Sequence, residues 1–139
     1  MMDLYAVIDT NVIVSALLTR DPDAPTLAVV RAALSRRIVP LYHQKMMDEY
    51  SEVLHREKFH LKEEQIQMVL SGVRDNGKEV FPRPTGEILV DMDDLIFYEV
   101  AMEKREDDAY LVTGNMKHYP IRDFIVTPAE MMKIINSMG

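Results

Sequence analysis

The sequence predicts an α/β fold with a mainly parallel central sheet, and two observations lead to this prediction. Five apolar residues run without a polar break from Leu4 to Ile8 and end on Asp9, which is typical of a strand buried on both faces of a sheet. Short apolar segments then alternate with helical patterns along the chain, as in parallel sheets with helical crossovers. The length of 139 residues predicts one domain, residues 1–139.

The first half of the chain predicts two strands, each followed by two helices. After the first strand, Thr10 and Asn11 favour a helix start, and residues 12–18 continue as a helix. Pro25 suits a first helical turn, with apolar residues at helical spacing through residue 36. Residues 38–42 form the second strand, and amphipathic helices are expected at 43–57 and 62–74.

The second half predicts three strands and two helices. The strands are expected at 78–81, 109–113 and 125–126. The acidic run 91–94 opens a helix whose residues 95–102 are apolar on nearly all sides, which indicates burial. Pro128 opens the last helix, which reaches about residue 136.

Composition excludes some functions and locations. The chain has no cysteine, so disulfides and thiolate metal sites are not available. A net charge of −7 argues against a protein that wraps nucleic acid through a large positive surface potential. A bound metal ion can still bind phosphate groups locally. No signal-peptide pattern is present, and no apolar run approaches the ~18 residues of a membrane span. A cytoplasmic protein with no membrane association is therefore expected.

Acidic and amide side chains are expected to meet at one edge of the sheet. Asp9 follows the first strand, Asn115 follows the strand at 109–113, and Asp94 opens a helix. Ligands of parallel sheets bind beyond the carboxyl ends of the strands, where these residues fall. The alternative for Asp9 is that it only caps the helix that follows.

Glu49 is the acid of the 43–57 helix that is expected to reach the same place. It lies about 100° from the centre of the apolar stripe, at the border of that stripe. Asp48 and Glu52 lie about 160° from the centre and are expected to face solvent.

A cluster of carboxylates predicts a hard divalent cation. The acids would repel one another and have raised pKa values unless a cation neutralised them. An all-oxygen set with no cysteine and no paired histidine favours Mg²⁺ or Mn²⁺. Such ions activate water and stabilise charge on a phosphodiester, so hydrolysis of a nucleic-acid backbone is the expected chemistry.

Four segments carry a resemblance to a known family. They read VIDTNVIVSALL at 7–18, DEYSEVL at 48–54, DMDD at 91–94 and YLVTGN at 110–115. In order and spacing this pattern resembles the PIN-domain ribonucleases, in the branch with the toxin components of toxin–antitoxin pairs (VapC-like). The resemblance implies a Rossmann-like PIN fold, a three-layer α/β/α sandwich, and a metal-dependent endoribonuclease.

The resemblance also implies roles and partners. Asp9, Glu49 and Asp94 match the three core acids that hold Mg²⁺ or Mn²⁺, with Asp94 favoured over Asp93 by its distance from the Thr-Gly strand end. Asn115 stands where many relatives carry a fourth Asp, and it assists without adding charge, so one metal ion is expected in the resting state. RNA as substrate, a small antitoxin protein and self-association as a homodimer are implied as well.

The residues next to these acids have more than one possible role. Thr10 and Thr113 either orient a carboxylate or water, or only close turns. Asp93 is expected to be the N-cap of its helix, and Asp91 and Glu99 are weaker candidates for direct involvement.

Basic residues give less information. Lys117 and His118 follow Asn115 in an expected surface loop and are candidates to meet phosphate, although a solvated loop residue is the preferred interpretation of His118. No aromatic-plus-basic platform of the kind that stacks bases is evident.

Competing classes fit less well. A haloacid-dehalogenase-type phosphatase needs a second Asp two residues after the first, where this chain has Asn11. A receiver domain needs a phosphoaccepting Asp at a central strand end, whereas Glu49 lies within a helix. The remaining alternative is a non-catalytic PIN-like RNA-binding or regulatory partner protein, which Asn115 favours.

Overall fold

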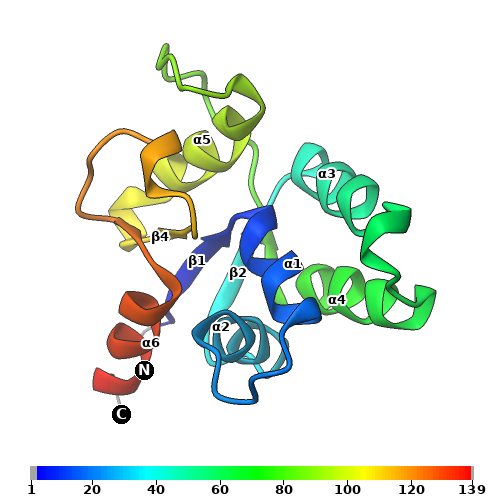
Figure 1. Ribbon diagram of the computed structural model, residues 1–139. Coiled ribbons are helices and arrows are strands. Elements are labelled where there is room, and N and C mark those ends of the chain that lie inside the picture. Colours follow the sequence, from blue (N-terminus) through cyan, green and yellow to red (C-terminus); the bar gives the residue numbers. More distant parts are fainter. Residues whose placement is uncertain (1–2, 139) are drawn as a thin grey trace.

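The computed structural model, which describes residues 3–138, has a five-stranded parallel sheet in the order β3-β2-β1-β4-β5 (Figure 1). The strands are β1 (Tyr5–Ile8), β2 (Val39–Tyr42), β3 (Lys78–Glu79), β4 (Tyr110–Val112) and β5 (Ile125–Val126). All four strand pairs are parallel. The predicted α/β fold with a parallel sheet is confirmed.

Helices cover both faces of this sheet. They are α1 (Thr10–Leu18), α2 (Pro25–Leu34), α3 (Gln44–Leu54), α4 (Glu63–Asn76), α5 (Leu95–Glu103) and α6 (Pro128–Ser137). Helix α5 packs against β1, β2 and β4 on one face, whereas α2, α4 and α6 pack together on the other (Figure 1). The result is a three-layer α/β/α arrangement.

The central strand is buried on both faces, as its continuous apolar run predicts. Ala6, Val7 and Ile8 have at most 2% of their surface exposed, and they belong to the same hydrophobic core as Leu111 of β4 and Phe97 of α5. In the described part of the chain, no helix has both the length and the apolar character needed to cross a membrane.

Two helix ends differ from the prediction. Helix α3 ends at Leu54 rather than at residue 57, because the chain then forms a short 3-10 helix, Glu57–Phe59, and turns back at His60, which has a φ of 52°. The acidic run before α5 forms another 3-10 turn, in which Asp91 accepts a hydrogen bond from the Asp93 N–H at 3.0 Å. Asp91 therefore caps the 3-10 turn, while Asp94 stands at the N-cap position of α5 without a capping hydrogen bond from its side chain. The assignment of Asp93 as N-cap is wrong.

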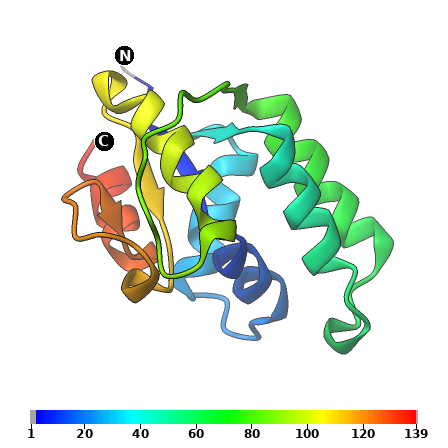
Figure 2. The ribbon, with the colours of Figure 1, turned by 90° about the horizontal axis from the view of Figure 1, so that it is seen from above.

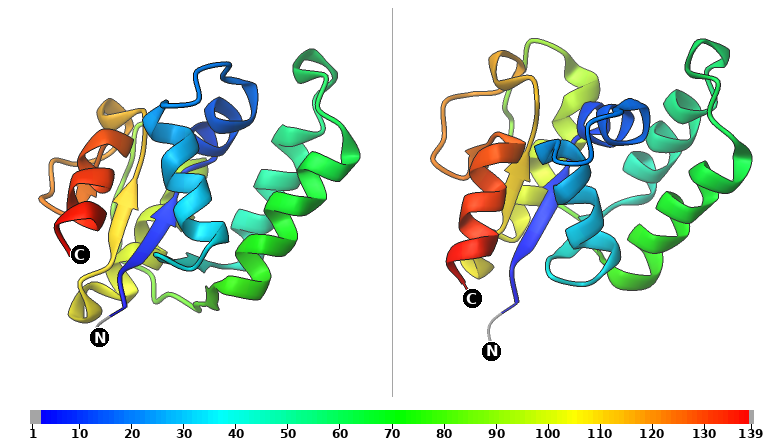
Figure 3. Two further views of the ribbon diagram at one scale, coloured as in Figure 1. Left: turned by 90° about the horizontal axis from the view of Figure 1, so that it is seen from below. Right: turned by 60° about the horizontal axis from the view of Figure 1, so that its bottom comes forward.

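The order of the strands defines where a ligand can bind. The chain moves outward from β1 to β2 and β3, and then returns to the other side of β1 to form β4 and β5. The crevice beyond the carboxyl ends of β1 and β4 is thus the switch point at which open α/β sheets bind ligands. There the Asp9 N–H donates to the Val112 carbonyl at 2.9 Å. The strand arrows in Figure 3 point toward this end of the molecule.

Candidate metal centre

A cavity of about 450 Å³ at the switch point brings the four predicted site residues together. Asp9, Glu49, Asp94 and Asn115 all line it. They come from the end of β1, from α3, from the residue before α5 and from the loop after β4. Residues far apart in the sequence therefore form one acidic wall.

Asp9 is buried, and its orientation is fixed by three donors on one oxygen. Oδ2 accepts hydrogen bonds from Thr113 Oγ1 at 2.8 Å, from the Tyr119 hydroxyl at 3.0 Å and from Asn11 Nδ2 at 3.1 Å. Asp9 stands at the N-cap position of α1, but its side chain makes no capping hydrogen bond. The side chain is thus directed to the cavity rather than to the helix end.

Asn11 links the ends of the two neighbouring strands. While its Nδ2 donates to Asp9, its Oδ1 accepts from the Gly114 N–H at 2.9 Å. A Cβ atom at Gly114 would lie 3.2 Å from the same Oδ1, closer than ordinary contact. The absence of a side chain at this position therefore allows the loop after β4 to approach Asn11.

Helix α3 is anchored so that Glu49 faces the cavity. The hydroxyl of the fully buried Tyr50 donates to the Ile8 carbonyl, just before Asp9. The Thr10 hydroxyl donates to Glu49 Oε2. Glu49 is half-buried, whereas Asp48 and Glu52 are exposed, in agreement with the helical geometry.

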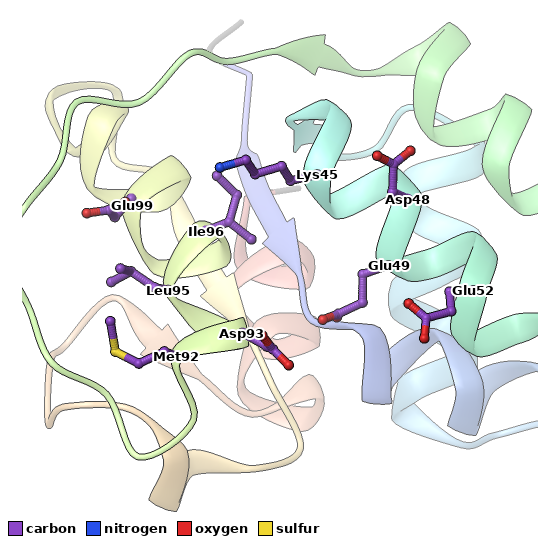
Figure 4. A pocket seen from close by; sticks show the side chains of 9 residues that line it. All are labelled: Lys45, Asp48, Glu49, Glu52, Met92, Asp93, Leu95, Ile96 and Glu99. Atoms are coloured by element: carbon purple, nitrogen blue, oxygen red, sulfur yellow. The ribbon is translucent and has the colours of Figure 1, made fainter.

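A second cavity, of about 490 Å³, adjoins Glu49 between α3 and α5. Figure 4 shows the Glu49 carboxylate reaching toward the start of α1, with the Asp93 carboxylate across the gap from it. Asp48 points away from this gap (Figure 4). Of the acids on α3, Glu49 is the one aimed at Asp9.

Asp94 and Asn115 meet through His118. Nδ1 of His118 lies 3.3 Å from Asp94 Oδ2, and Asn115 Nδ2 lies 3.2 Å from the same ring. The 3-10 turn Met116–His118 folds the imidazole back over the cavity. His118 therefore lines the cavity while its side chain stays 37% exposed to solvent, and Lys117 is exposed.

Burial raises the pKa values of all three carboxylates. Desolvation is the largest cause for Asp9, Glu49 and Asp94, and together with the negative charges of Asp9 and Asp91 it raises the pKa of Asp94 to about 6. The negative charge of Asp9 raises the pKa values of the other two further. The expected upward shift is present, with burial rather than mutual repulsion as its main cause.

The carboxylates have the chemistry of a Mg²⁺ or Mn²⁺ site, but their side chains do not converge on one point. Within residues 3–138, no three acidic or histidine side chains are arranged to hold a metal ion together. Glu49 is turned to Thr10 and Asp94 to His118. The donor set of hard oxygens fits the ion, and a cation would offset the cost of burying these charges. Rotation of Glu49 and Asp94 is needed to close such a site.

The two weaker candidates for direct involvement, Asp91 and Glu99, have different surroundings. Asp91 lines the cavity with the other acids. Glu99 instead accepts hydrogen bonds from the Thr85 N–H at 2.6 Å and the Thr85 hydroxyl at 2.9 Å, and so fastens the segment before α5. Thr10 and Thr113 both donate hydrogen bonds to carboxylates, so both orient a carboxylate. Thr113 also closes the turn after β4, because its hydroxyl accepts from the Asn115 N–H at 2.9 Å.

Three lining or supporting residues go beyond the sequence expectations. Tyr119 holds Asp9, and Arg56 and Phe59 line the cavity. The last two are a basic and an aromatic residue at the same cavity. The sequence pattern predicts helix through residue 57. It therefore gives no signal for the turn after α3 that places Arg56 and Phe59 at the cavity.

Comparisons with known proteins agree on the architecture. The family model described as PIN domain matches residues 5–117. Among solved structures, the crystal structure of PAE2754 from Pyrobaculum aerophilum is similar, with a TM-score of 0.58 over 97% of this chain and 90% of that chain. The two sequences are 15% identical, so this likeness concerns the fold alone. No curated protein matches the chain.

Proposed function

The chain belongs to the PIN domain family, and on this premise we propose that it is a Mg²⁺- or Mn²⁺-dependent endoribonuclease that hydrolyses RNA phosphodiester bonds. PIN domains are generally nucleases and typically use divalent metals. The observation that carries the proposal is that Asp9, Glu49 and Asp94 line one cavity at the switch point of the sheet.

Each site residue has a part in this proposal. Asp9, Glu49 and Asp94 would hold the ion, which supplies Lewis acidity to activate water and to stabilise charge on the phosphate. Three donors fix Asp9 before binding, and supporting groups of this kind tune metal affinity. Asn115 offers a neutral oxygen, so the set carries charge for one tightly held ion in the resting state.

The direct test is cleavage of a labelled RNA in the presence of Mn²⁺. Asp9→Asn and Glu49→Gln should each lower the cleavage rate by at least about 100-fold, because each removes a charged ligand. Glu52→Gln makes the same chemical change at an exposed position on α3 and should cleave at the wild-type rate. Thermal unfolding checks that the variants fold. Wild-type cleavage by Asp9→Asn would contradict the proposal.

A second candidate is a non-catalytic RNA-binding or regulatory protein. It is supported by Asn115 in place of a fourth acid and by the lack of a preformed three-acid arrangement within residues 3–138. Under this alternative, the wild type binds RNA but Mn²⁺ produces no cleavage, and Asp9→Asn does not change binding. The same two assays therefore separate the candidates.

We further propose that the protein is the toxin of a toxin–antitoxin pair, with a small antitoxin partner and a homodimeric state. Besides the sequence resemblance, the segment before α5 supports a partner surface. Phe81, Ile88, Val90 and Met92 are 52–86% exposed, and several exposed apolar side chains on one segment favour an interaction site there. Induced wild-type protein should arrest bacterial growth while Asp9→Asn does not, and light scattering should give twice the mass of one chain.

A further inference from the structure

The turn between α3 and α4, residues 55–62, lies at the rim of the acidic cavity. Arg56 and Phe59 line the same cavity as Asp9, Glu49 and Asp94. Helices α3 and α4 lie side by side (Figure 2), and their turn projects at the end of the molecule toward which the strand arrows point (Figure 3). A chain bound across the carboxylates would therefore meet this turn.

Phe59 is an aromatic residue that the hydrophobic core does not use. It is partly exposed, and it belongs neither to the buried core nor to the partly buried residues packed against that core. Turn hydrogen bonds from Phe59 N–H to Arg56 C=O at 3.1 Å and from His60 N–H to Glu57 C=O at 3.0 Å shape the backbone. The ring is thus held on a defined turn, where it can stack on a planar group.

Positive charge accompanies this ring. Arg56 is the one lysine or arginine lining the cavity in the described part of the chain. Its exposed side chain makes no ion pair or hydrogen bond within residues 3–138. Nζ of Lys58 lies 5.1 Å from the centre of the Phe59 ring.

Charge complementarity indicates which ligand fits the cavity beside Arg56 and Phe59. The acidic wall repels phosphate, so a bound backbone needs a cation beside it, and arginine matches phosphate with paired hydrogen bonds. A base stacks on an aromatic ring whatever its sequence. An arginine without an ion pair within residues 3–138, on the same turn as an aromatic ring outside the core, thus fits one nucleotide.

We propose that Phe59 and Arg56 form a nucleotide-binding subsite for single-stranded RNA, in which Phe59 stacks on the base and Arg56 binds the phosphate of a nucleotide flanking the cleaved bond. This inference rests on the proposed function and names its substrate class. The cavity of about 450 Å³ lies within the range of small-molecule sites, about 300–1,000 Å³. Stacking requires an unpaired base, so the subsite favours a single strand over a duplex.

The test is equilibrium binding of a short fluorescein-labelled single-stranded RNA, measured by anisotropy in EDTA so that metal-dependent cleavage cannot occur. Phe59→Leu keeps the apolar bulk but removes the ring, and it should weaken binding about tenfold, equivalent to about 1.4 kcal/mol. Phe59→Trp should bind within about twofold of the wild type. The control Ile121→Ala removes an apolar side chain that is 98% exposed and lies outside this cavity and should have no effect.

Two further arms test the phosphate contact and the strand preference. Arg56→Gln should reduce the slope of log K against log salt concentration by about 0.7, the value for one phosphate contact on a single strand. Arg74→Gln, on an exposed position of α4, should leave the slope unchanged. With a duplex of the same sequence, Phe59→Leu should change affinity by less than about twofold, because paired bases do not reach the ring.

The outcomes separate this inference from the proposed function. Equal binding by Phe59→Leu and the wild type, equal losses for single strand and duplex, or no measurable single-strand binding by the wild type would overturn the subsite. Failure of the nuclease proposal would appear instead as absent Mn²⁺-dependent cleavage, while the loss of binding in Phe59→Leu remains.

Discussion

Neutralising Asp94 should stabilise the metal-free protein. Burial, together with the negative charges of Asp9 and Asp91, raises the pKa of Asp94 from 3.8 to about 6, which corresponds to at most about 3 kcal/mol at 1.36 kcal/mol per pKa unit. The cavity is open to solvent, which screens charge, so about half of this is expected, roughly 1.5 kcal/mol. Asp94→Asn should therefore raise the melting temperature by about 5 °C at pH 7.5 in EDTA.

The pH dependence of this gain has a definite sign. Below about pH 4, Asp94 is protonated in both the folded and the unfolded state, so Asp94→Asn and the wild type should have equal stability. As the pH rises through about 6, the wild type must bury the charge and loses stability, while the variant does not. The gain thus appears between pH 4 and pH 6 and is complete at pH 7.5.

Thermal unfolding followed by circular dichroism at pH 4.0, 5.5 and 7.5 measures the gain. Asp107→Asn replaces an exposed aspartate and should change stability by less than about 0.5 kcal/mol at each pH. A destabilised Asp94→Asn variant at pH 7.5, or a gain that persists at pH 4.0, would refute the burial of this carboxylate as the cause.

Three further substitutions test the residues that orient or extend the carboxylate set. Thr10→Val removes the hydrogen bond that Glu49 gives up when it turns to the ion and should strengthen Mn²⁺ binding about two- to tenfold by isothermal titration calorimetry; weaker binding would contradict the rotation of Glu49. Asn115→Asp adds a fourth charge and should strengthen Mn²⁺ binding about tenfold, whereas unchanged binding would show that this side chain does not reach the ion. Tyr119→Phe removes a buried donor to Asp9 and should lower the free energy of unfolding in urea by about 1–2 kcal/mol, a loss that a purely packing role of the ring would not produce.

The sequence is sufficient to predict the elements that depend on local pattern. The unbroken apolar run before Asp9 predicts a fully buried strand, and β1 is one. The angle of Glu49 on its helix predicts its half-buried position between exposed Asp48 and Glu52. Both follow from periodicity, since the period of a helix or strand decides which side chains face the core.

Features that depend on turns could not be predicted in the same way. Helix α3 ends at Leu54, where His55 is its C-cap and Arg56 takes an extended backbone conformation, and no proline or glycine marks that end. The cap at Asp91 depends on the choice between two aspartates with the same chemistry. Tyr119 reaches Asp9 from 110 residues away, a contact that only the tertiary fold creates.

The central claim is that Asp9, Glu49 and Asp94 share one hard divalent ion once Glu49 and Asp94 rotate toward the fixed Asp9 carboxylate. Crystals grown with Mn²⁺ and measured at its absorption edge test this claim directly, because the anomalous signal locates the ion itself. The claim predicts a peak within bonding distance of oxygens from all three carboxylates, with Glu49 turned away from Thr10. A peak bound elsewhere on the chain, or no peak at saturating Mn²⁺, would contradict it.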